Sequence, residues 1–183
     1  MTAVRDQSVG AYVEAIASTA AVPGGGSAAA LAASMGAALV GMVARISARK
    51  ARQEAQRAAL EQVVPELDQL ASRLLDLSQE DIDAYRAVIE ARKSDREGAA
   101  VERAYERAAE VPLATAAAAA RSLALAVEVS QHAWEMVASD LSTGNKLLQA
   151  GLDGALANVA VNLPELKGEA ATRLERRYRE LLN

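Results

Sequence analysis

Apolar residues recur every three or four positions through most of the chain, which is the spacing of amphipathic helices. The longest such stretch covers residues 51–93, and its apolar members are Leu60, Val63, Val64, Leu67, Leu70, Leu74, Leu77, Ile82, Tyr85, Val88 and Ile89. No run of Val, Ile and Thr alternates with polar residues between turn signals, so no strand is predicted. The pattern therefore predicts an all-α fold.

The same spacing predicts further helices at about 8–18, 27–50, 99–137, 141–163 and 169–182. The first would bury Val9, Tyr12, Val13 and Ile16. Pro65 and Pro112 fall inside the long helical stretches and are expected to kink or divide them. Because neither a linker nor a repeat is evident, residues 1–183 are expected to form a single domain, a bundle of five to seven helices.

Two breaks carry residues that commonly cap helices. Ser27 follows the sequence Pro-Gly-Gly-Gly at 23–26 and is predicted as the N-cap of the second helix. Ser139 and Asp140 are predicted to separate the helix that ends at about residue 137 from the next one, and to cap that next helix.

The stretch 15–44 has no charged residue and is long enough to cross a membrane. Pro23 and three glycines interrupt it, however, and it is mostly Ala, Gly and Ser, so we interpret its second half as a helix buried on all sides. Two rows of small residues four apart would let another backbone approach closely, in this chain or in a partner: Ala29, Ala33 and Ala37, and Ala28, Ala32 and Gly36. We therefore expect a homodimer or a higher homo-oligomer.

Composition narrows the possible chemistry. The 183 residues contain no Cys and one His, so the sequence predicts no disulfide, no zinc–thiolate site and no metal ligated by two His of one chain. A net charge of −4 argues against nucleic-acid binding. The N-terminus has no apolar signal core, and we expect a cytoplasmic protein without a resident metal or cofactor.

Asp81 is the first candidate for chemistry. Counting along the predicted helix places it on the face that also carries Leu74, Tyr85 and Val88, whereas Asp83 points away. A carboxyl group on a buried face has a raised pKa, which suits acid–base work near neutral pH. The alternative is that Asp81 lies at the edge of the stripe, exposed or capping another element.

The glycines Gly24, Gly25 and Gly26 with Ser27 form the second candidate. They precede a helix, whose free N–H groups and dipole favour an anion or a carbonyl oxygen, and glycine lets a ligand approach the backbone. A flexible connection between two helices would use the same residues.

Asn158 and Asn162 lie four apart on a helix otherwise made of Leu, Ala and Val. Asn is unfavourable inside a helix unless its amide has partners, so the pair predicts either interhelical hydrogen bonds or the polar wall of a pocket. Ser139 and Asp140 could likewise be a simple cap or part of a site.

Cations gather where the second helix ends, at Arg45, Arg49, Lys50 and Arg52. They complement the negative end of the helix dipole, and they could also bind an anionic tail. His132 could act as a general base, although a single His beside Trp134 is more typical of a surface.

Taken together these segments resemble one known family, the cyclodeaminase/cyclohydrolase enzymes of folate one-carbon metabolism. The resemblance rests on 23–30 (Pro-Gly-Gly-Gly-Ser-Ala-Ala-Ala), 35–43, Asp81 with Ala84-Tyr85, Arg103, 111–113, Ser139-Asp140, and 154–163 with its Asn-Val-Ala-Val-Asn-Leu ending. It implies a dimeric all-helical protein that binds tetrahydrofolate near the subunit interface and uses no metal. One departure is at 91–94, where relatives usually carry Leu-Pro-Lys; this places a role for Lys93 in doubt.

The resemblance implies conversion of 5-formiminotetrahydrofolate to 5,10-methenyltetrahydrofolate with release of ammonia. Asp81 is then the candidate acid–base and Asp140 the second candidate. The substrate-binding candidates are Gly24, Gly25, Gly26, Ser27, Arg49, Lys50, Ser139, Asn158 and Asn162, with Arg49 or Lys50 meeting the glutamate tail. A formiminotransferase on a separate chain is a possible partner.

Two rival functions stay open. One is hydrolysis of methenyltetrahydrofolate to 10-formyltetrahydrofolate, which needs the same ligand and carboxylate. The other is a non-catalytic helical subunit that binds folate or a partner. That second rival predicts an ion-paired, closed-off Asp81 and no cleft beside Gly24 to Ser27.

Overall fold

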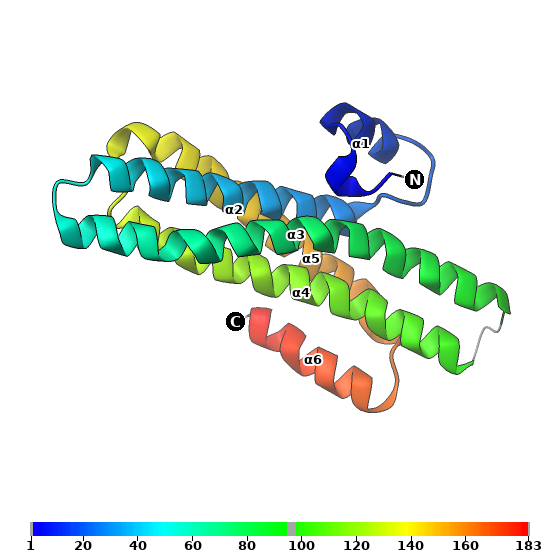
Figure 1. Cartoon of the computed structure of the whole chain (residues 1–183). Coiled ribbons are helices and arrows are strands. Elements are labelled where there is room, and N and C mark those ends of the chain that lie inside the picture. Colours follow the sequence, from blue (N-terminus) through cyan, green and yellow to red (C-terminus); the bar gives the residue numbers. More distant parts are fainter. Residues whose placement is uncertain (1, 95–97, 183) are drawn as a thin grey trace.

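Four long helices run side by side in alternating directions and form the body of the molecule (Figure 1). The computed structural model describes residues 2–94 and 98–182. Its long helices are α2 (Gly25–Lys50), α3 (Glu54–Ser94), α4 (Ala99–Ser130) and α5 (Ala138–Asn162). Each contacts the next in cyclic order, and α2 also contacts α4 across the bundle. The described residues contain no strand, so the all-α prediction is confirmed.

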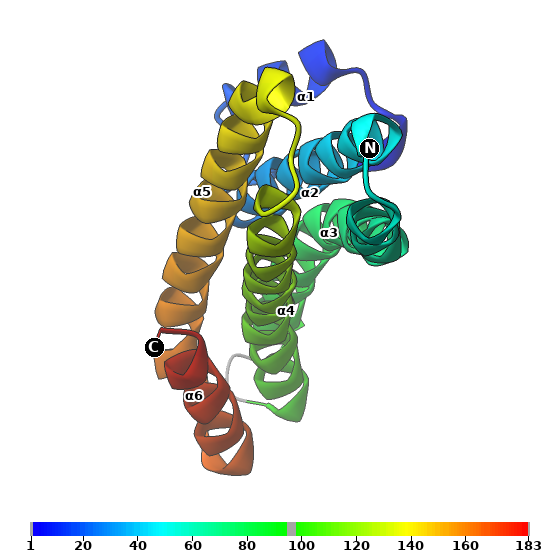
Figure 2. The ribbon, with the colours of Figure 1, turned by 90° about the vertical axis from the view of Figure 1, so that its left-hand side faces the viewer.

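Two shorter helices flank the bundle on opposite sides, α1 (Val9–Ile16) and α6 (Gly168–Leu182) (Figures 1 and 2). The described residues also contain three single turns of 3₁₀ helix, at Val4–Asp6, Glu135–Val137 and Leu163–Glu165. The described chain thus has six α-helices, within the predicted five to seven.

The small residues of α2 pack against α5 of the same chain. A Cβ placed on Gly151 would lie 2.6 Å from the Cβ of Ala33, and one on Gly36 would lie 2.8 Å from the carbonyl oxygen of Gly144. The two backbones are therefore too close for larger side chains, because packed interiors leave no spare volume. Ala29, Ala33 and Gly36 of the predicted rows therefore meet α5 of the same chain.

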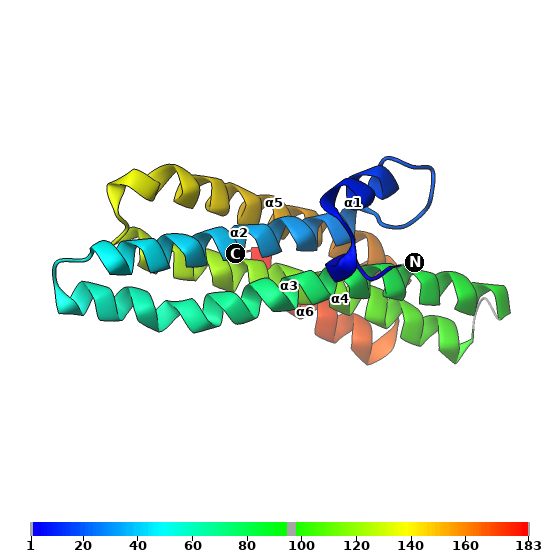
Figure 3. The same ribbon diagram turned by 45° about the horizontal axis from the view of Figure 1, so that its top comes forward.

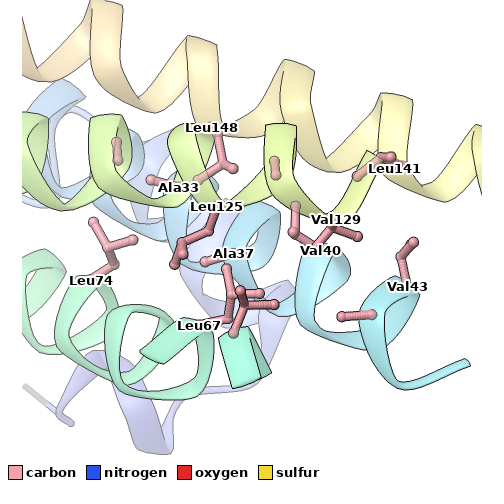
Figure 4. Packing of buried hydrophobic residues seen from close by; sticks show 14 of the residues in the cluster. Ala33, Ala37, Val40, Val43, Leu67, Leu74, Leu125, Val129, Leu141 and Leu148 are labelled. Atoms are coloured by element: carbon pink, nitrogen blue, oxygen red, sulfur yellow. The ribbon is translucent and has the colours of Figure 1, made fainter. Parts of the chain in front are cut away.

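Larger side chains from the four long helices fill the rest of the core. Figure 4 shows them meeting between the helices: Val40 and Val43 of α2, Leu67 and Leu74 of α3, Leu125 and Val129 of α4, and Leu141 and Leu148 of α5. These branched side chains pack together with the buried alanines in one continuous core.

Two predicted helix starts are wrong. Helix α2 begins at Gly25 with Gly24 as its N-cap, so Ser27 lies inside the first turn, where its side chain is fully buried. Helix α5 begins at Ala138, ahead of Ser139 and Asp140, and the break falls earlier, between Ser130 and Glu135. At α2 the Ser27 side chain is bonded to Tyr12 and Ser78 of other helices instead of capping its own. At α5 no side chain caps the helix start.

The prolines do not divide the long helices. Pro65 lies inside α3 and Pro112 inside α4, and both helices continue through them. Each proline removes one intrahelical N–H donor. The carbonyl that Pro112 leaves without its usual donor is that of Ala108, whose replacement partner belongs to the site described below.

Two predictions about buried apolar surfaces, the face of α1 and the full burial of α2, were only partly right. Of the predicted face of α1, Tyr12 is buried, but Val9, Val13 and Ile16 are 83%, 58% and 41% exposed. Helix α2 is packed by α3, α4 and α5, yet its outer side is open, and Met35 there is 49% exposed.

By length and apolar composition alone, α2 and α4 could each cross a membrane. In the bundle, most of the apolar window of α2 and nearly half of that of α4 are buried against other helices. A helix in the centre of a bundle needs the same apolar composition, which accounts for the buried part of each window.

Candidate active site

A cleft of about 340 Å³ opens near the end of the bundle where α2 begins and α5 ends. Figure 3 shows these two ends lying close to the second half of α3 and the first half of α4. The cleft is lined by Ala21, Val22, Gly24, Gly25, Gly26, Asp81, Ala84, Tyr85, Val88, Ile89, Arg92, Tyr105, Ala108, Asn158, Val161 and Asn162. Residues predicted separately from three segments of the sequence, at 24–26, 81 and 158–162, thus form one site.

Asp81 is a half-buried carboxyl group in the wall of this cleft, and it also caps α2. The first turn of a helix has N–H groups without intrahelical partners, and Gly24 has no side chain to accept from them. Asp81, from α3, accepts a hydrogen bond from the backbone N–H of Ser27. The capping interpretation of Asp81 is therefore correct, and the same carboxyl group also lines the cleft.

Burial raises the pKa of the Asp81 carboxyl above its ordinary value, and the Ser27 N–H opposes this by stabilising the carboxylate. No Lys, Arg or His of the described residues forms a salt bridge with Asp81, whereas Asp83 is exposed and bonded to Gln79 and Arg86. The predicted difference between the two aspartates is confirmed.

The Asp81 carboxyl group occupies the position that a side chain at Gly26 would fill. A Cβ on Gly26 would lie 2.2 Å from Asp81 Oδ1, which real side chains essentially never allow. A Cβ on Gly25 would lie 3.7 Å from Asn158 Nδ2, and one on Gly24 3.7 Å from the Ala21 carbonyl oxygen, both ordinary contacts. The glycine run therefore has one position that must be small because a side chain of another helix occupies its place.

The two asparagines serve as helix-to-helix contacts and as cleft wall. Asn162 Nδ2 donates to the carbonyl of Ala108 at 3.0 Å and to that of Asn158 at 3.0 Å. The Ala108 carbonyl is the one deprived of its donor by Pro112, four residues on. Asn158 Nδ2 donates to the Gly154 carbonyl at 2.8 Å, and both asparagines line the cleft.

Sequence reasoning missed three polar groups of the cleft. Tyr85 was expected in the apolar stripe, but it is 43% exposed and lines the cleft. Arg92 Nη1 donates to the Tyr105 hydroxyl at 3.1 Å, and both side chains line the cleft. Helical spacing could have found two of them, because positions four and eleven residues after Asp81 return to its face.

Ser27, a predicted substrate-binding residue, has a fully buried side chain and does not line the cleft. Four other predicted site residues lie farther away. Arg49 and Lys50 are at the opposite end of α2, about 35 Å away at 1.5 Å per residue. Lys50 Nζ lies 5.2 Å from the Trp134 ring, and together with His132 they line a separate depression. Ser139 and Asp140 begin α5, whereas the cleft lies where α5 ends. Within one copy these residues do not meet the Asp81 cleft, because long straight helices separate their two ends.

Lys93 pairs with Glu90 at 3.2 Å, is exposed and does not line the cleft. Of the altered segment 91–98, residues 95–97 lie outside the described residues. Among the described residues, no three Asp, Glu or His side chains come together where they could hold a metal ion.

An all-helical bundle with one half-buried carboxyl group, a glycine-rich helix start and a cleft of this size defines a site suited to proton transfer on a small organic ligand. The chain belongs to the formiminotransferase-cyclodeaminase family, whose profile matches residues 8–180.

Named relatives cover the chain almost completely. It is 34% identical over 170 residues to the formimidoyltransferase-cyclodeaminase of Gallus gallus, which matches 88% of this chain and 31% of that protein. It is 33% identical over 184 residues to the methenyltetrahydrofolate cyclohydrolase of Methylorubrum extorquens, matching 96% of this chain and 88% of that protein. The chain therefore spans about a third of the bifunctional relative's length and most of the cyclohydrolase.

The fold is also that of a solved structure. The formiminotetrahydrofolate cyclodeaminase of Thermotoga maritima superposes with a TM-score of 0.90 at 23% sequence identity, covering 98% of this chain and 90% of that one. At 23% identity this likeness shows the fold alone.

Proposed function

We propose that this protein acts on the one-carbon unit of tetrahydrofolate, converting 5-formiminotetrahydrofolate to 5,10-methenyltetrahydrofolate with release of ammonia. The observation that carries the proposal is Asp81, a half-buried carboxyl group with a raised pKa in the wall of a cleft. Membership of the formiminotransferase-cyclodeaminase family supports the choice of substrate.

In the proposed reaction the formimino group is protonated on its nitrogen, N10 of the folate attacks the formimino carbon, and a tetrahedral intermediate that carries an amino group forms. N10 loses its proton, the bond from that carbon to the formimino nitrogen breaks, and the nitrogen leaves protonated as ammonia. One carboxyl group whose pKa lies closer to neutrality than that of an ordinary Asp can take the first proton and supply the second. Asp81 is that group, and as a carboxylate it also stabilises the cationic methenyl product.

The cleft also suggests how folate is held. Tyr85 and Tyr105 are aromatic side chains beside Asp81, able to contact a planar pterin ring. Arg92 is a cation lining the cleft, so we assign the glutamate tail to Arg92 in place of Arg49 and Lys50. Asn158 contributes a polar edge to the same wall.

A second candidate activity is hydrolysis of methenyltetrahydrofolate to 10-formyltetrahydrofolate. The similarity to the Methylorubrum extorquens cyclohydrolase, over 96% of this chain, favours it. Water would add to the methenyl carbon and lose one proton to Asp81. The resulting hydroxyl group would then lose its proton and N5 would take one up as the bond from the carbon to N5 breaks, which leaves the formyl group on N10.

The non-catalytic alternative fits less well. It predicted an ion-paired, closed-off Asp81 and no cleft, whereas no described cation pairs with Asp81 and the carboxyl group lines the cleft beside Gly24, Gly25 and Gly26.

Ultraviolet absorbance of the methenyl chromophore separates these functions. Purified protein is mixed separately with 5-formiminotetrahydrofolate and with methenyltetrahydrofolate, and buffer alone gives the background rate. Growth of the chromophore from the formimino compound supports cyclodeaminase. Loss of the chromophore faster than in buffer, with the formimino compound inert, supports cyclohydrolase. No change in either would refute both activities.

We also propose that two copies associate through the uncharged outer side of α2. Met35 is 49% exposed there, Ala38 beside it is exposed, and Leu31 and Met42 are partly exposed. An uncharged stripe on the surface of a helix is typical of an interface. Helix α1 adds the exposed Val9, Val13 and Ile16.

The oligomeric state tests this interface. Light scattering after size exclusion should give a dimer for the natural protein and a monomer for Met35→Glu. Val127→Glu is the matched control, because Val127 is 63% exposed on α4, away from α2's outer side. A dimer that survives Met35→Glu but not Val127→Glu would move the interface to α4.

The remaining proposals concern the surroundings of the enzyme. We propose that a formiminotransferase on a separate chain supplies the formimino compound, as the name of the bifunctional Gallus gallus relative suggests. We keep the expectations of a cytoplasmic location and of no resident metal or cofactor as part of the same proposal.

A further inference from the structure

Three buried hydroxyl groups lie directly behind Asp81, one from each of α1, α2 and α3. The Tyr12 hydroxyl is 2.7 Å from Ser27 Oγ, and Ser27 Oγ is 2.8 Å from Ser78 Oγ. Ser78 Oγ also donates to the Ser27 carbonyl oxygen at 2.9 Å. We call Tyr12, Ser27 and Ser78 the hydroxyl network. None of the three lines the cleft, so none can touch a bound substrate there.

The direction of each hydrogen bond in the network follows from counting protons. A hydroxyl group has one proton, and a carbonyl oxygen can only accept. Since Ser78 gives its proton to the Ser27 carbonyl, Ser27 Oγ must donate to Ser78, and the Tyr12 hydroxyl must donate to Ser27. Every proton in the network is therefore committed, and the network ends on the backbone of Ser27.

Ser27 is thereby held at its carbonyl and at its side chain, while its backbone N–H faces Asp81. A backbone held on several sides presents its N–H in a fixed direction, which is the condition for stabilising a nearby charge. The network is fully buried at Ser27 and Ser78, and Tyr12 is only 5% exposed, so water does not compete for these bonds.

We propose that Tyr12 and Ser78 are positioning residues for Asp81: they hold Ser27 so that its backbone N–H stays aimed at the carboxylate. The inference rests on the proposed acid–base role of Asp81. It also gives α1 a function, because Tyr12 is the buried residue of that helix and joins it to the site.

The test compares two serines that each join α2 to α3. Ser78→Ala removes a bond behind Asp81. Ser34→Ala is the matched control, because Ser34 Oγ donates to the Ala71 carbonyl at 2.7 Å across the same pair of helices but away from the cleft. Carbon-13 NMR of labelled Asp carboxyl groups follows the Asp81 titration in each variant, with the signal assigned by its loss in Asp81→Asn.

Loss of the Ser78 hydroxyl should loosen Ser27 and weaken its N–H bond to the carboxylate, so the pKa of Asp81 should rise further. The other titratable or charged side chains lining the cleft are Tyr85, Arg92 and Tyr105, and both serine variants leave them unchanged. Tyr12→Phe, which keeps the ring packing, should shift the pKa in the same direction by less. Ser34→Ala should leave it unchanged.

Kinetics gives a second readout. Ser78→Ala should move the acidic limb of the kcat profile to higher pH and lower kcat at neutral pH by about 2–10-fold, the factor that one hydrogen bond is worth, with KM unchanged. Equal Asp81 titrations in the Ser78 and Ser34 variants would overturn the positioning role. If the natural protein turns over neither folate, the proposed function fails, while the NMR titration still decides whether the network positions Asp81.

Discussion

The two helix starts at opposite ends of the bundle use acidic residues in different ways. At the start of α5, Asp140 lies in the first turn of its own helix and complements that helix's dipole locally. At the start of α2 the acid comes from another helix: Asp81 of α3 reaches the Ser27 N–H across Gly26. The packing of α3 against the start of α2 partly covers the Asp81 carboxyl group and raises its pKa, and the same group lines the cleft.

The cations differ in the same way. Arg49 and Lys50 complement the end of α2, and Lys50 lies over Trp134 on the surface. Arg92 instead bonds to Tyr105 from a neighbouring helix and lines the cleft. Local sequence predicted only Arg49 and Lys50 as site cations, and the packing of α3 against α4 places Arg92 at the cleft instead.

The largest expected effect compares the two aspartates. Asp81→Asn should lower kcat by about 10²–10⁴-fold, the usual contribution of an acid–base group, while helical content by circular dichroism stays the same. Asp140→Asn is the control and should keep kcat within about twofold. If the Asp140 variant were the inactive one, the site would lie at the other end of the bundle.

Gly26→Ala should come next, because its Cβ would displace the Asp81 carboxyl group. A shift of about 1 Å can lower kcat by roughly 100-fold, and steady-state kinetics would detect it. Gly25→Ala adds the same methyl group one residue earlier with only ordinary contacts, so it should remain close to the natural protein. Equal activity in the two variants would contradict the proposal that Asp81 needs the space left by the missing side chain at Gly26.

Asn162→Ala should lower the free energy of unfolding by about 1–3 kcal/mol, since it leaves the Ala108 carbonyl unpaired. In a Pro112→Ala background, residue 112 regains an N–H for that carbonyl, and the cost of Asn162→Ala should fall. Urea unfolding of the four proteins forms a double-mutant cycle. Strict additivity would show that Asn162 does not compensate for the proline.

Asp81→Asn should also make the protein more stable near neutral pH. Burial raises the pKa of Asp81 in the folded state, so between the unfolded and folded pKa values the folded protein binds more protons. The natural protein therefore loses stability as pH rises from the unfolded pKa of Asp81 to the folded pKa, and the Asp81→Asn variant does not, because Asn carries no charge. The melting temperature should rise by a few degrees at pH 7, and the difference should shrink as pH falls below the ordinary pKa of Asp.

The smallest effect is expected at the opposite end. Lys50→Ala removes a cation–π contact and should cost about 0.5–1 kcal/mol of stability by urea unfolding. KM for folate should not change, whereas Arg92→Ala should raise it. A raised KM in the Lys50 variant alone would return the glutamate tail to the end of α2.

Helical periodicity was sufficient to predict the all-α class, the long helices and the face of α3 that carries Asp81. These are properties of spacing within one helix, which the chain itself specifies. The resemblance to the folate family, confirmed by the family match, came from the same short segments.

The exact helix starts, the exposure of Tyr85 and the separation of Arg49 from the cleft could not be predicted in this way. Ser27 was a good local cap, yet bonds to Tyr12 and Ser78 turn its side chain inward. Asn162 offered two interpretations, and only the position of α4 shows that its amide bonds to Ala108.

The sequence by itself determined which residues can share a face, because a helix repeats every 3.6 residues whatever surrounds it. Only the tertiary structure decided which faces meet. Asp81 and Gly26 are far apart in the chain and become a site because α2 and α3 pack closely enough for one carboxyl group to fill the place of a missing side chain. Burial, and with it the raised pKa of Asp81, depends on that packing, which no local pattern records.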